Sequence, residues 1–489
     1  MNSYIGIDLG TSGVKLLLAA ADGEVLAEVN ESYPIYHPYP EWSEQNPSDW
    51  WEAVKRGLKK LTDGQNAKSV KGISFSGQMH GLVAVDANGK VIRPCILWND
   101  GRTEKQTRYL NEKIGQKNLA AYTGNIAFAG FTAPKILWMQ ENEPENYKKI
   151  AKILLPKDYI AFMLTGEYST DYSDASGTLL LDVENKCWSA KMCEICGVTS
   201  GMLPTLHESF EVIGTIKPDI AKETGLDKTV KVTAGAGDNA AAAIGTGTTG
   251  KGKCNISLGT SGTIFISSDK FTAHENNSLH SFCHADGGYH LLGCILSAAS
   301  CRKWWLEDIL GSTDYVSDDL SVSESDTQGL LFLPYLSGER SPHNDTKAKG
   351  AFIGLTSTTT RAQMSRAIME GVAFALRDCL EIAKNSGIDI SGTTICGGGS
   401  KGEAWRKIVS DVLNLPIFVQ GSEYGPAFGA SILAMTGCGE YPSVQTAIDK
   451  LVKVKPDVTP TKENVEKYNA GYNLYKNLYP LLKDTFSKM

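Results

Sequence analysis

The chain has 489 residues, of which 42% are hydrophobic, 21% charged and 9% aromatic. This apolar content excludes intrinsic disorder, and the length fits two large domains or three of average size. The net charge of -7 argues against a broad nucleic-acid-binding face. No apolar run is long enough to predict a membrane span, and the first residues, MNSYIGIDLG, are typical of a first strand rather than a signal peptide.

Cysteine usage points to a reducing compartment. The chain has 11 cysteines and no visible export signal, which predicts free thiols in a cytoplasm. Cys193 and Cys196 form one CxxC pair. A structural zinc site would need a second pair, which the sequence does not offer, so we expect ordinary thiols at both positions.

The sequence Leu-Gly-Thr-Ser-Gly occurs twice, at residues 9–13 and 258–262, about half a chain apart. Each copy lies between two apolar segments, a pattern that predicts a hairpin of strand, tight turn and strand. Two hairpins at this spacing predict two related domains, which we place at residues 1–245 and 246–489.

Strands and helices alternate along the rest of the chain, which predicts an α/β class with mixed sheets. An Asp22-Gly23 turn closes a second hairpin after the first one. The other predicted elements are a helix that begins near Asn46-Pro47, a strand over 72–77, a helix over 361–383, a strand over 393–396, a helix over 403–413 and a packing helix over 463–486.

The two Gly/Thr/Ser turns are candidate phosphate-binding loops, because such turns leave several backbone N–H groups free for an anion. Two facing loops can hold the β- and γ-phosphates of a nucleotide from both sides. Asp8 stands directly before the first loop and would repel a phosphate without a cation between them, which indicates Mg²⁺, bound directly or through water. The alternative is that Gly10 and Gly13 only form a turn, capped by Asp8; the duplication favours phosphate binding.

A third candidate loop is the run Gly397-Gly398-Gly399-Ser400 between a predicted strand and a predicted helix. Three glycines allow a backbone to approach a flat ring or a ribose closely. Neither GxGxxG nor GxxxxGK[ST] is present, so the chain has no dinucleotide fingerprint and no P-loop. A loop that only needs positive φ is the alternative interpretation.

A candidate catalytic base lies in the segment Gly-Ala-Gly-Asp-Asn-Ala at residues 235–240. Val230 and Val232 predict a strand before it, and the alanine run after it predicts a helix. Asp238 would then stand at a helix N-terminus, where the dipole favours the ionised carboxylate. Phosphoryl transfer to a hydroxyl uses such a carboxylate as its base. Because Asp is also a favoured helix cap, the motif leaves both interpretations open.

Taken together, these motifs resemble the FGGY family of carbohydrate kinases. The resemblance rests on both LGTSG loops, residues 235–239 and the glycine triplet, and extends from residue 4 to about residue 440. Further segments with the family's patterns lie at 130–142 and 350–370, and those most similar to its pentulose branch lie at 76–81, 96–102, 155–159 and 337–344.

The resemblance implies an actin-like, two-domain α/β fold (the ribonuclease H-like class of sugar kinases, heat-shock chaperones and actin) with mixed sheets flanked by helices. It also implies ATP-dependent, Mg²⁺-supported phosphorylation of a pentulose, D-xylulose, on its terminal O5. Asp238 would be the general base and Asp8 would support Mg-ATP. The implied substrate-binding residues are Gln78, Met79, His80, Trp98, Asp100, Arg102 and Asn239. The implied cofactor-binding residues are Gly10, Thr11, Ser12, Lys15, Gly259, Thr260, Ser261, Gly398, Gly399 and Ser400.

Three alternatives share the same loops. They are a sister kinase for ribulose, gluconate, fuculose or glycerol, an actin-like ATPase serving as a chaperone or filament protein, and a catalytically silent sugar sensor. A chaperone would need a peptide-binding domain, for which no segment is left, and both Asp8 and Asp238 argue against a silent sensor. We expect no nucleic-acid or membrane partner; the only protein partner considered is a second copy of the chain in a homodimer.

Overall fold

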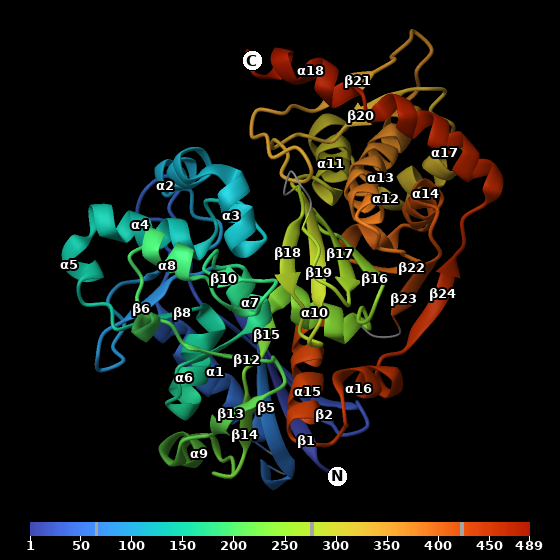
Figure 1. Cartoon of the computed structure of the whole chain (residues 1–489). Helices are drawn as coiled ribbons and strands as arrows, with labels where there is room; N and C mark the ends of the chain where they lie inside the picture. Colours follow the sequence, from blue (N-terminus) through green and yellow to red (C-terminus); the bar gives the residue numbers. More distant parts are fainter. Residues whose placement is uncertain (64–66, 274–277, 421–424) are drawn as a thin grey trace.

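The molecule consists of two lobes, each built on a seven-stranded mixed sheet flanked by helices (Figure 1). The computed structural model describes residues 1–63, 67–273, 278–420 and 425–489. The two-domain α/β architecture with mixed sheets that the sequence predicts is therefore confirmed. Within the described residues, no helix combines the length and apolar character that a membrane crossing requires.

The first sheet has the strand order β13-β14-β5-β1-β2-β3, and β15 pairs with the end of β5. β1, β5 and β14 run parallel, whereas β2, β3 and β13 are antiparallel to their neighbours. The strands are β1 (Ser3–Leu9), β2 (Gly13–Ala20), β3 (Val25–Ser32), β5 (Val70–Gly77), β13 (Val212–Thr215), β14 (Lys231–Thr233) and β15 (Ala236–Gly237).

The second sheet has the order β18-β19-β17-β16-β22-β23-β24. Six of its strands repeat the parallel and antiparallel pairings of the first sheet in the same order. They are β19-β17-β16-β22-β23-β24, which correspond one for one to β3-β2-β1-β5-β14-β13, so the two sheets are copies of one pattern. Both predicted LGTSG hairpins are present, as β1–β2 and β16–β17. The strands are β16 (Lys253–Leu258), β17 (Gly262–Ser268), β18 (His280–Cys283), β19 (Tyr289–Ile295), β22 (Gly392–Cys396), β23 (Ile417–Gln420) and β24 (Val454–Val458).

Five short ribbons lie outside the two sheets. They are β4 (Glu44–Gln45) with β7 (Cys95–Ile96), β6 (Val83–Val85) with β8 (Lys152–Leu154), β9 (Ser169–Asp171) with β12 (Thr205–His207), β10 (Leu181–Asp182) with β11 (Cys187–Trp188), and β20 (Leu331–Leu333) with β21 (Ala351–Ile353).

Helices cover the sheets of both halves. Those of the first half are α1 (Pro47–Thr62), α2 (Glu104–Arg108), α3 (Gln116–Thr123), α4 (Thr132–Asn142), α5 (Pro144–Tyr147), α6 (Pro156–Thr165), α7 (Tyr172–Ser176), α8 (Ala190–Ile195), α9 (Pro218–Thr224) and α10 (Asp238–Thr246). Those of the second half are α11 (Ala299–Lys303), α12 (Tyr315–Ser323), α13 (Arg361–Asn385), α14 (Glu403–Leu413), α15 (Gly425–Gly437), α16 (Val444–Leu451), α17 (Lys462–Tyr475) and α18 (Leu478–Phe486).

The helix predicted over 463–486 is wrong as a single element. The chain forms two helices there, α17 and α18, separated at Lys476 and Asn477. Pro480 provides the physical reason, because it has no N–H to bond the carbonyl of Lys476 and its ring would clash there in one continuous helix. It is tolerated instead in the first turn of α18, where that N–H would have no intrahelical partner.

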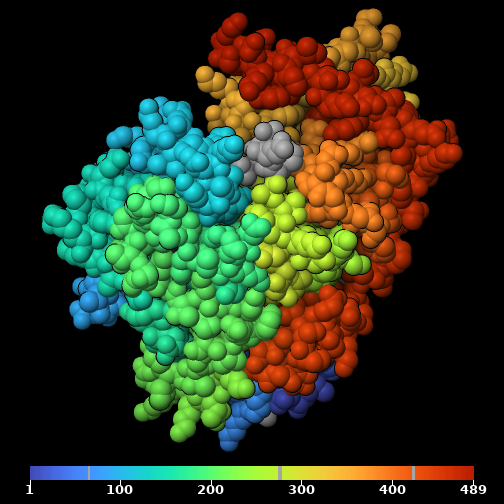
Figure 2. Space-filling view, viewed as in Figure 1, coloured from blue at the N-terminus to red at the C-terminus, as the bar shows by residue number. Residues whose placement is uncertain are grey.

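The two halves interlock through α15. This helix of the second half packs against β1, β5 and α10 of the first half, and Figure 1 shows it beside β1 and β5. In the space-filling view the orange-red surface of this part of the second half lies directly against the green and blue surface of the first half (Figure 2). The backbones of α10 and α15 touch where they cross: a Cβ on Gly429 would lie 1.9 Å from the Ala241 carbonyl oxygen, and one on Gly245 would lie 2.3 Å from that of Gly425. Glycine is therefore required at this crossing, which fixes the two sheets at close range.

Candidate functional site

Three parallel strands of the first sheet bring two carboxylates to one edge. In the register of the sheet Asp8 of β1 lies beside Ser76 of β5, and Ser76 lies beside Ala236 of β15. Asp238 follows β15 directly as the first residue of α10. Ligands of open α/β sheets bind at this carboxyl edge of the strands. The sequence-predicted base and the sequence-predicted magnesium-supporting residue are therefore neighbours.

The environment of Asp238 suits a proton acceptor. Burial, and next the negative charge of Asp8, raise the pKa of Asp238 to about 7. Its Oδ1 accepts hydrogen bonds from the backbone N–H of Asn239 at 2.7 Å and from the Asn239 side-chain amide at 2.9 Å. Among the described residues Oδ2 has no hydrogen-bond partner. Burial also raises the pKa of Asp8.

A cavity of about 220 Å³ lies between the two halves, with Asp238 in its wall. Its lining combines a carboxylate, an amide, imidazoles, a guanidinium and several aromatic faces, the mixture that a small polyhydroxylated ligand needs. The first half contributes Met79, His80, Trp98, Phe128, Gly130, Phe131, Asp238 and Asn239, and the second half contributes Ser261, Thr263, His280, Phe282, Leu292, Cys294, Ile295, Leu296 and Arg340.

His80 is held as a neutral hydrogen-bond acceptor. Its Nδ1 lies 2.8 Å from the Gly177 carbonyl oxygen, so Nδ1 carries the proton and donates. The ring stacks on Phe131 with centroids 4.7 Å apart. Burial lowers the pKa of His80 to about 3, which keeps the ring uncharged at neutral pH. Nε2 is then left as an acceptor for a ligand hydroxyl.

Lys135 of α4 supports this wall of the cavity from behind. Its buried ammonium group donates to the backbone carbonyls of His80 at 2.8 Å and Gly130 at 2.7 Å. The Thr132 hydroxyl donates to the same His80 carbonyl at 3.1 Å. His80 has a φ of +70°, an unusual backbone conformation for a residue other than glycine, and these bonds hold it there. Sequence reasoning missed Lys135, because a single lysine within a predicted family segment carries no signal of its own.

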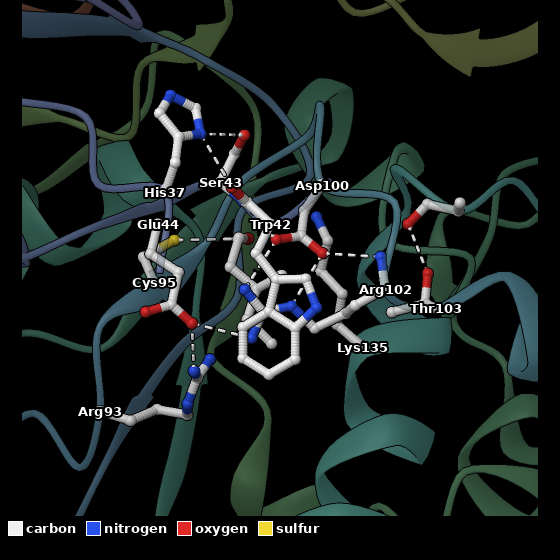
Figure 3. A network of polar contacts seen from close by, with 12 residues as sticks. His37, Trp42, Ser43, Glu44, Arg93, Cys95, Asp100, Arg102, Thr103 and Lys135 are labelled. Atoms are coloured by element: carbon white, nitrogen blue, oxygen red, sulfur yellow. Dashed lines mark hydrogen bonds and ion pairs between the residues drawn. The ribbon is translucent and has the colours of Figure 1, made fainter. Parts of the chain in front are cut away.

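The segment from Trp98 to Arg102 divides between the cavity and a buried network. Trp98 lines the cavity, and its indole N–H donates to the Thr11 hydroxyl of the first loop at 3.1 Å. Asp100 and Arg102 are not in the cavity lining; Arg102 donates three hydrogen bonds to the Asp100 carboxylate, one from its backbone N–H at 3.0 Å and two from its guanidinium at 2.8 and 2.7 Å. Figure 3 shows this network, in which Arg102 also pairs with Glu44 at 2.8 Å. The network anchors the segment that carries Trp98.

Gln78 also lies outside the cavity lining and reaches the first loop through a relay. Its side-chain amide donates to Gln45 at 2.9 Å, and Gln45 donates to the Thr11 carbonyl at 2.7 Å. Lys15 forms an ion pair with Glu28 at 3.1 Å. Together with Asp8 and Ser12, Lys15 lines a surface depression beside the first loop. In this loop the Gly10 N–H bonds back to the Gly13 carbonyl at 3.0 Å.

The second loop and the glycine triplet share one edge of the second sheet. The carbonyls of Gly259 and Thr260 accept the N–H groups of Ala299 and Ala298, so this loop is fixed by the start of α11. Gly397 has a φ of +88°, and a Cβ there would lie 2.7 Å from the Leu258 backbone. The predicted cofactor-binding residues Gly259, Thr260 and Ser261 therefore lie in a loop next to a short 3-10 helix (Gly398–Lys401) that contains the other three, Gly398, Gly399 and Ser400.

The carboxylates fit a magnesium ion that binds together with a nucleotide. Within the described ranges, no group of three or more His, Cys, Asp or Glu side chains could hold a metal alone. Mg²⁺ usually takes one or two carboxylates and completes its shell with substrate phosphates and water. Asp8, beside the first glycine loop, provides one such carboxylate, and Asp238 stays available as the base.

The chain is related to known proteins along nearly its whole length. The model for the FGGY family of carbohydrate kinases matches with its N-terminal domain at residues 3–245 and its C-terminal domain at residues 254–438. The chain therefore belongs to the FGGY family of carbohydrate kinases, whose members use ATP. It is 40% identical to a xylulose kinase of Escherichia coli (strain K12), across 98% of this chain and 99% of that protein.

Solved structures confirm the fold that the resemblance implies. A Brucella ovis protein described as a xyloylose kinase superposes with a TM-score of 0.94 at 38% identity, covering 99% of this chain and 100% of that one. A gluconate kinase from Lactobacillus acidophilus has the same TM-score of 0.94 at 26% identity, covering 100% of this chain and 99% of that one. Because kinases of different sugars superpose equally well, the side chains of the cavity must decide the substrate.

Proposed function

We propose that this chain transfers the γ-phosphoryl group of ATP to O5 of D-xylulose, giving ADP and D-xylulose 5-phosphate. The observation that carries the proposal is Asp238, a half-buried carboxylate in the wall of the cavity, with one oxygen fixed and the other free. The choice of sugar is supported by the xylulose kinases of Escherichia coli and Bacillus subtilis, which match 98% and 99% of the chain.

Asp238 acts as the general base. Its Oδ2 takes the proton of the O5 hydroxyl while O5 attacks the γ-phosphorus. The bond from the γ-phosphorus to the bridging oxygen breaks, ADP leaves with the bonding electrons, and the proton stays on Asp238. Asn239 keeps Oδ1 occupied, so the free oxygen is the one that faces a ligand. A pKa of about 7 matches this role, because base and working pH are then close.

The two glycine loops hold the nucleotide. Backbone N–H groups of residues 11–12 and 259–261 bind the phosphates from opposite halves, while the Gly10 N–H closes the first turn and residues 398–400 lie on the adenosine side. Asp8, with Asp238 nearby, would hold Mg²⁺. A bound magnesium ion supplies positive charge that neutralises the phosphates. The Trp98 indole, bonded to Thr11, links the sugar cavity to the first phosphate loop.

The sugar is recognised by apolar side chains and by polar groups that can act only as a hydrogen-bond donor or only as an acceptor. Met79 and Phe131 provide apolar contact, His80 accepts a hydrogen bond, and the Asn239 amide lies beside the base. Loops and cavity are shared between the halves, so we expect the halves to close on the sugar and to exclude water from the γ-phosphate. Solution scattering should show compaction with D-xylulose; identical curves would contradict closure.

A coupled ADP-release assay across D-xylulose, ribulose, fuculose, gluconate and glycerol tests the substrate. We expect the highest kcat/KM with D-xylulose and only slow ATP hydrolysis without sugar. Phosphorus NMR of the product should place the new ester at O5. If gluconate or glycerol has the higher kcat/KM, the pentulose assignment fails while the kinase assignment stands. If no sugar stimulates ADP release, an actin-like ATPase is the better description.

We also propose a cytoplasmic setting, supported by the fact that all eleven cysteines are free thiols. Mass determination by light scattering will show whether two copies form the homodimer considered from the sequence.

A further inference from the structure

Arg340 enters the cavity on a rigid loop of the second half. The Ser341 N–H donates to the Cys294 carbonyl at 2.9 Å, and the Ser341 hydroxyl accepts the Cys294 N–H at 3.1 Å. Glu339 accepts the N–H of Leu296 at 2.8 Å and that of Arg340 at 2.8 Å. These bonds attach the loop to the end of β19, so the position of the Arg340 backbone is fixed.

The guanidinium of Arg340 crosses to the first half without meeting a carboxylate. Its Cζ lies 5.6 Å from the ring centroid of Phe128, which belongs to the first half. Among the described residues Arg340 forms no ion pair, whereas Arg93 and Arg102 of the neighbouring network both pair with Glu44. In the part of the chain that the structure describes, the one side-chain hydrogen bond of Arg340 is with the Cys294 thiol, a weak acceptor. A half-buried guanidinium in a cavity costs free energy unless its donors find acceptors, so the remaining donors of Arg340 are available for an acceptor on a ligand.

Arg340 lies at the aromatic wall of the cavity that also holds His80 and His280. Its Cζ stands over the Phe128 ring, whose centroid lies 4.9 Å from that of His280 and 5.4 Å from that of Phe131, and Phe131 stacks on His80. If the proposed function holds and O5 of the sugar meets Asp238, the opposite end of the pentulose carries the C2 carbonyl and the C1 hydroxyl. Arg340 therefore stands where the carbonyl group of the substrate would lie.

The polarities of the two side chains at this end are complementary. A guanidinium can only donate, and His80 Nε2 can only accept. A ketone oxygen can only accept, so it pairs with Arg340. A hydroxyl in the same place must also find an acceptor for its own proton; Arg340 offers none, and the one lone pair of His80 Nε2 is used by the C1 hydroxyl in this arrangement. An unpaired buried group of this kind lowers affinity far more than a change of shape does.

We propose that Arg340 is a specificity-determining residue that binds the C2 carbonyl of an open-chain 2-ketose and discriminates against the corresponding polyols. This inference rests on the proposed function, since it takes O5 as the reacting end. On this proposal the second half of the molecule contacts the sugar as well as the nucleotide.

The test compares D-xylulose with xylitol and D-arabitol, the two polyols formed by reducing its C2 carbonyl. In Arg340→Met, kcat/KM for D-xylulose should fall roughly 10- to 100-fold, mainly through KM, as expected for the loss of a charged hydrogen bond. The inhibition constants of xylitol and D-arabitol should change less than about threefold. Arg340→Lys, which keeps the charge and some donors, should recover part of the loss. The matched control Arg361→Met removes an exposed arginine of α13. It should change neither the kcat/KM for D-xylulose nor the inhibition constants of the polyols.

Two results would overturn the inference. Equal weakening of ketose and polyols would show that Arg340 does not read the carbonyl, and unchanged ketose kinetics in Arg340→Met would show no contact with the sugar. Calorimetric binding of D-xylulose without ATP provides a second readout, and thermal unfolding of each variant verifies the fold. The activity of the unmodified protein on D-xylulose tests the proposed function separately, because the inference concerns only the ratio between ketose and polyol.

Discussion

The two LGTSG loops have the same backbone setting and different chemistry. Each joins an antiparallel hairpin whose first strand also pairs in parallel with a later strand, β1 with β5 and β16 with β22. At the residue before the loop, however, the first half has Asp8 and the second has Ser257. The two halves therefore share the turn proposed to bind phosphate, but only the first has a negative charge directly before it.

The same asymmetry recurs at the helices that cross between the halves. α10 begins with Asp238, whereas α15 begins with Gly425 and Pro426. Phosphates already carry negative charge, so carboxylates on both sides would repel them; one acidic half with a cation and one neutral half avoid this. The comparison teaches that the first half holds both carboxylates of the proposed acid–base chemistry, whereas the second contributes uncharged loops and the Arg340 guanidinium to the same cavity region.

The largest expected effect comes from removing the charge of the base. Asp238→Asn keeps the shape but cannot take a proton, so sugar-dependent turnover should fall about 10²–10⁴-fold. Steady-state ADP release measures this, and D-xylulose binding should persist. A variant with near-normal turnover would reduce Asp238 to a structural residue of α10.

Stability gives an internal control for the same variant. The pKa of Asp238 is raised above its unfolded value, so ionisation destabilises the folded state increasingly as the pH rises from about 4 to 7. Asp238→Asn should therefore unfold at a higher temperature than the unmodified protein at pH 8, with a smaller gap at pH 5.

Asp8 and Ser257 test the asymmetry directly, because they hold equivalent positions. Asp8→Asn should lower kcat/KM for Mg-ATP about 10²-fold, since it removes a carboxylate proposed to hold the cation, and should leave sugar binding without nucleotide mostly intact. Ser257→Ala should cost only a few-fold. Equal losses in both variants, or a loss of sugar affinity alone in Asp8→Asn, would contradict the division of roles.

His80 tests whether the first half also provides the hydroxyl acceptor. His80→Ala should weaken transition-state binding of the sugar by about 1–3 kcal/mol, the usual cost of an unpaired polar group. The KM for ATP should change little. His207→Ala, which removes a histidine of β12 outside the cavity, is the matched control. An unchanged sugar KM in His80→Ala would remove His80 from the sugar site.

The pH profile should show the electrostatic link between the two carboxylates. A base must be ionised, so kcat/KM should fall about tenfold per unit as the pH drops below the pKa of Asp238, which is about 7. The negative charge of Asp8 contributes to that raised pKa, so Asp8→Asn should shift the acid limb to lower pH. An acid limb that stays in place would mean that the two groups do not interact.

The smallest expected effect comes from the hydrogen bond that joins Trp98, in the wall of the sugar cavity, to Thr11 of the first LGTSG loop. Trp98→Phe keeps an aromatic face but loses the hydrogen bond to Thr11. We expect a two- to fivefold fall in kcat/KM, about the value of one neutral hydrogen bond at a half-exposed position. A similar change in Thr11→Val, with no further loss in the double variant, would assign the effect to this bond.

The sequence predicted those parts of the fold that local patterns determine. Both hairpins, the helix over 403–413 and the place of Asp238 at the start of a helix are confirmed. Met79, His80 and Trp98 line one cavity with Asp238, as their short motifs indicated.

Features that depend on distant contacts were out of reach. Lys135 acts on a backbone carbonyl 55 residues away, and Arg340 meets Phe128 from the other half of the chain. Neither relation leaves a periodic or spaced pattern in the sequence. Asp100 and Arg102 look like ligand-binding residues in a list of polar side chains, but their geometry pairs them with each other. The three-dimensional structure is needed to tell a charged side chain that is free for a ligand from one that is paired with a neighbouring charge.

The packing of α15 on the first sheet has a consequence for biosynthesis. Tyr4 and Leu17 are buried in a cluster completed by Phe428 and Ile432, which the ribosome adds only near the end of the chain. Translation proceeds at about 5–20 residues per second, so the interval between the proposed boundary at residue 245 and the end of α15 lasts on the order of 10–40 s. Throughout that interval the nascent first lobe exposes an unfinished apolar face, and holdase chaperones have their best opportunity to bind it.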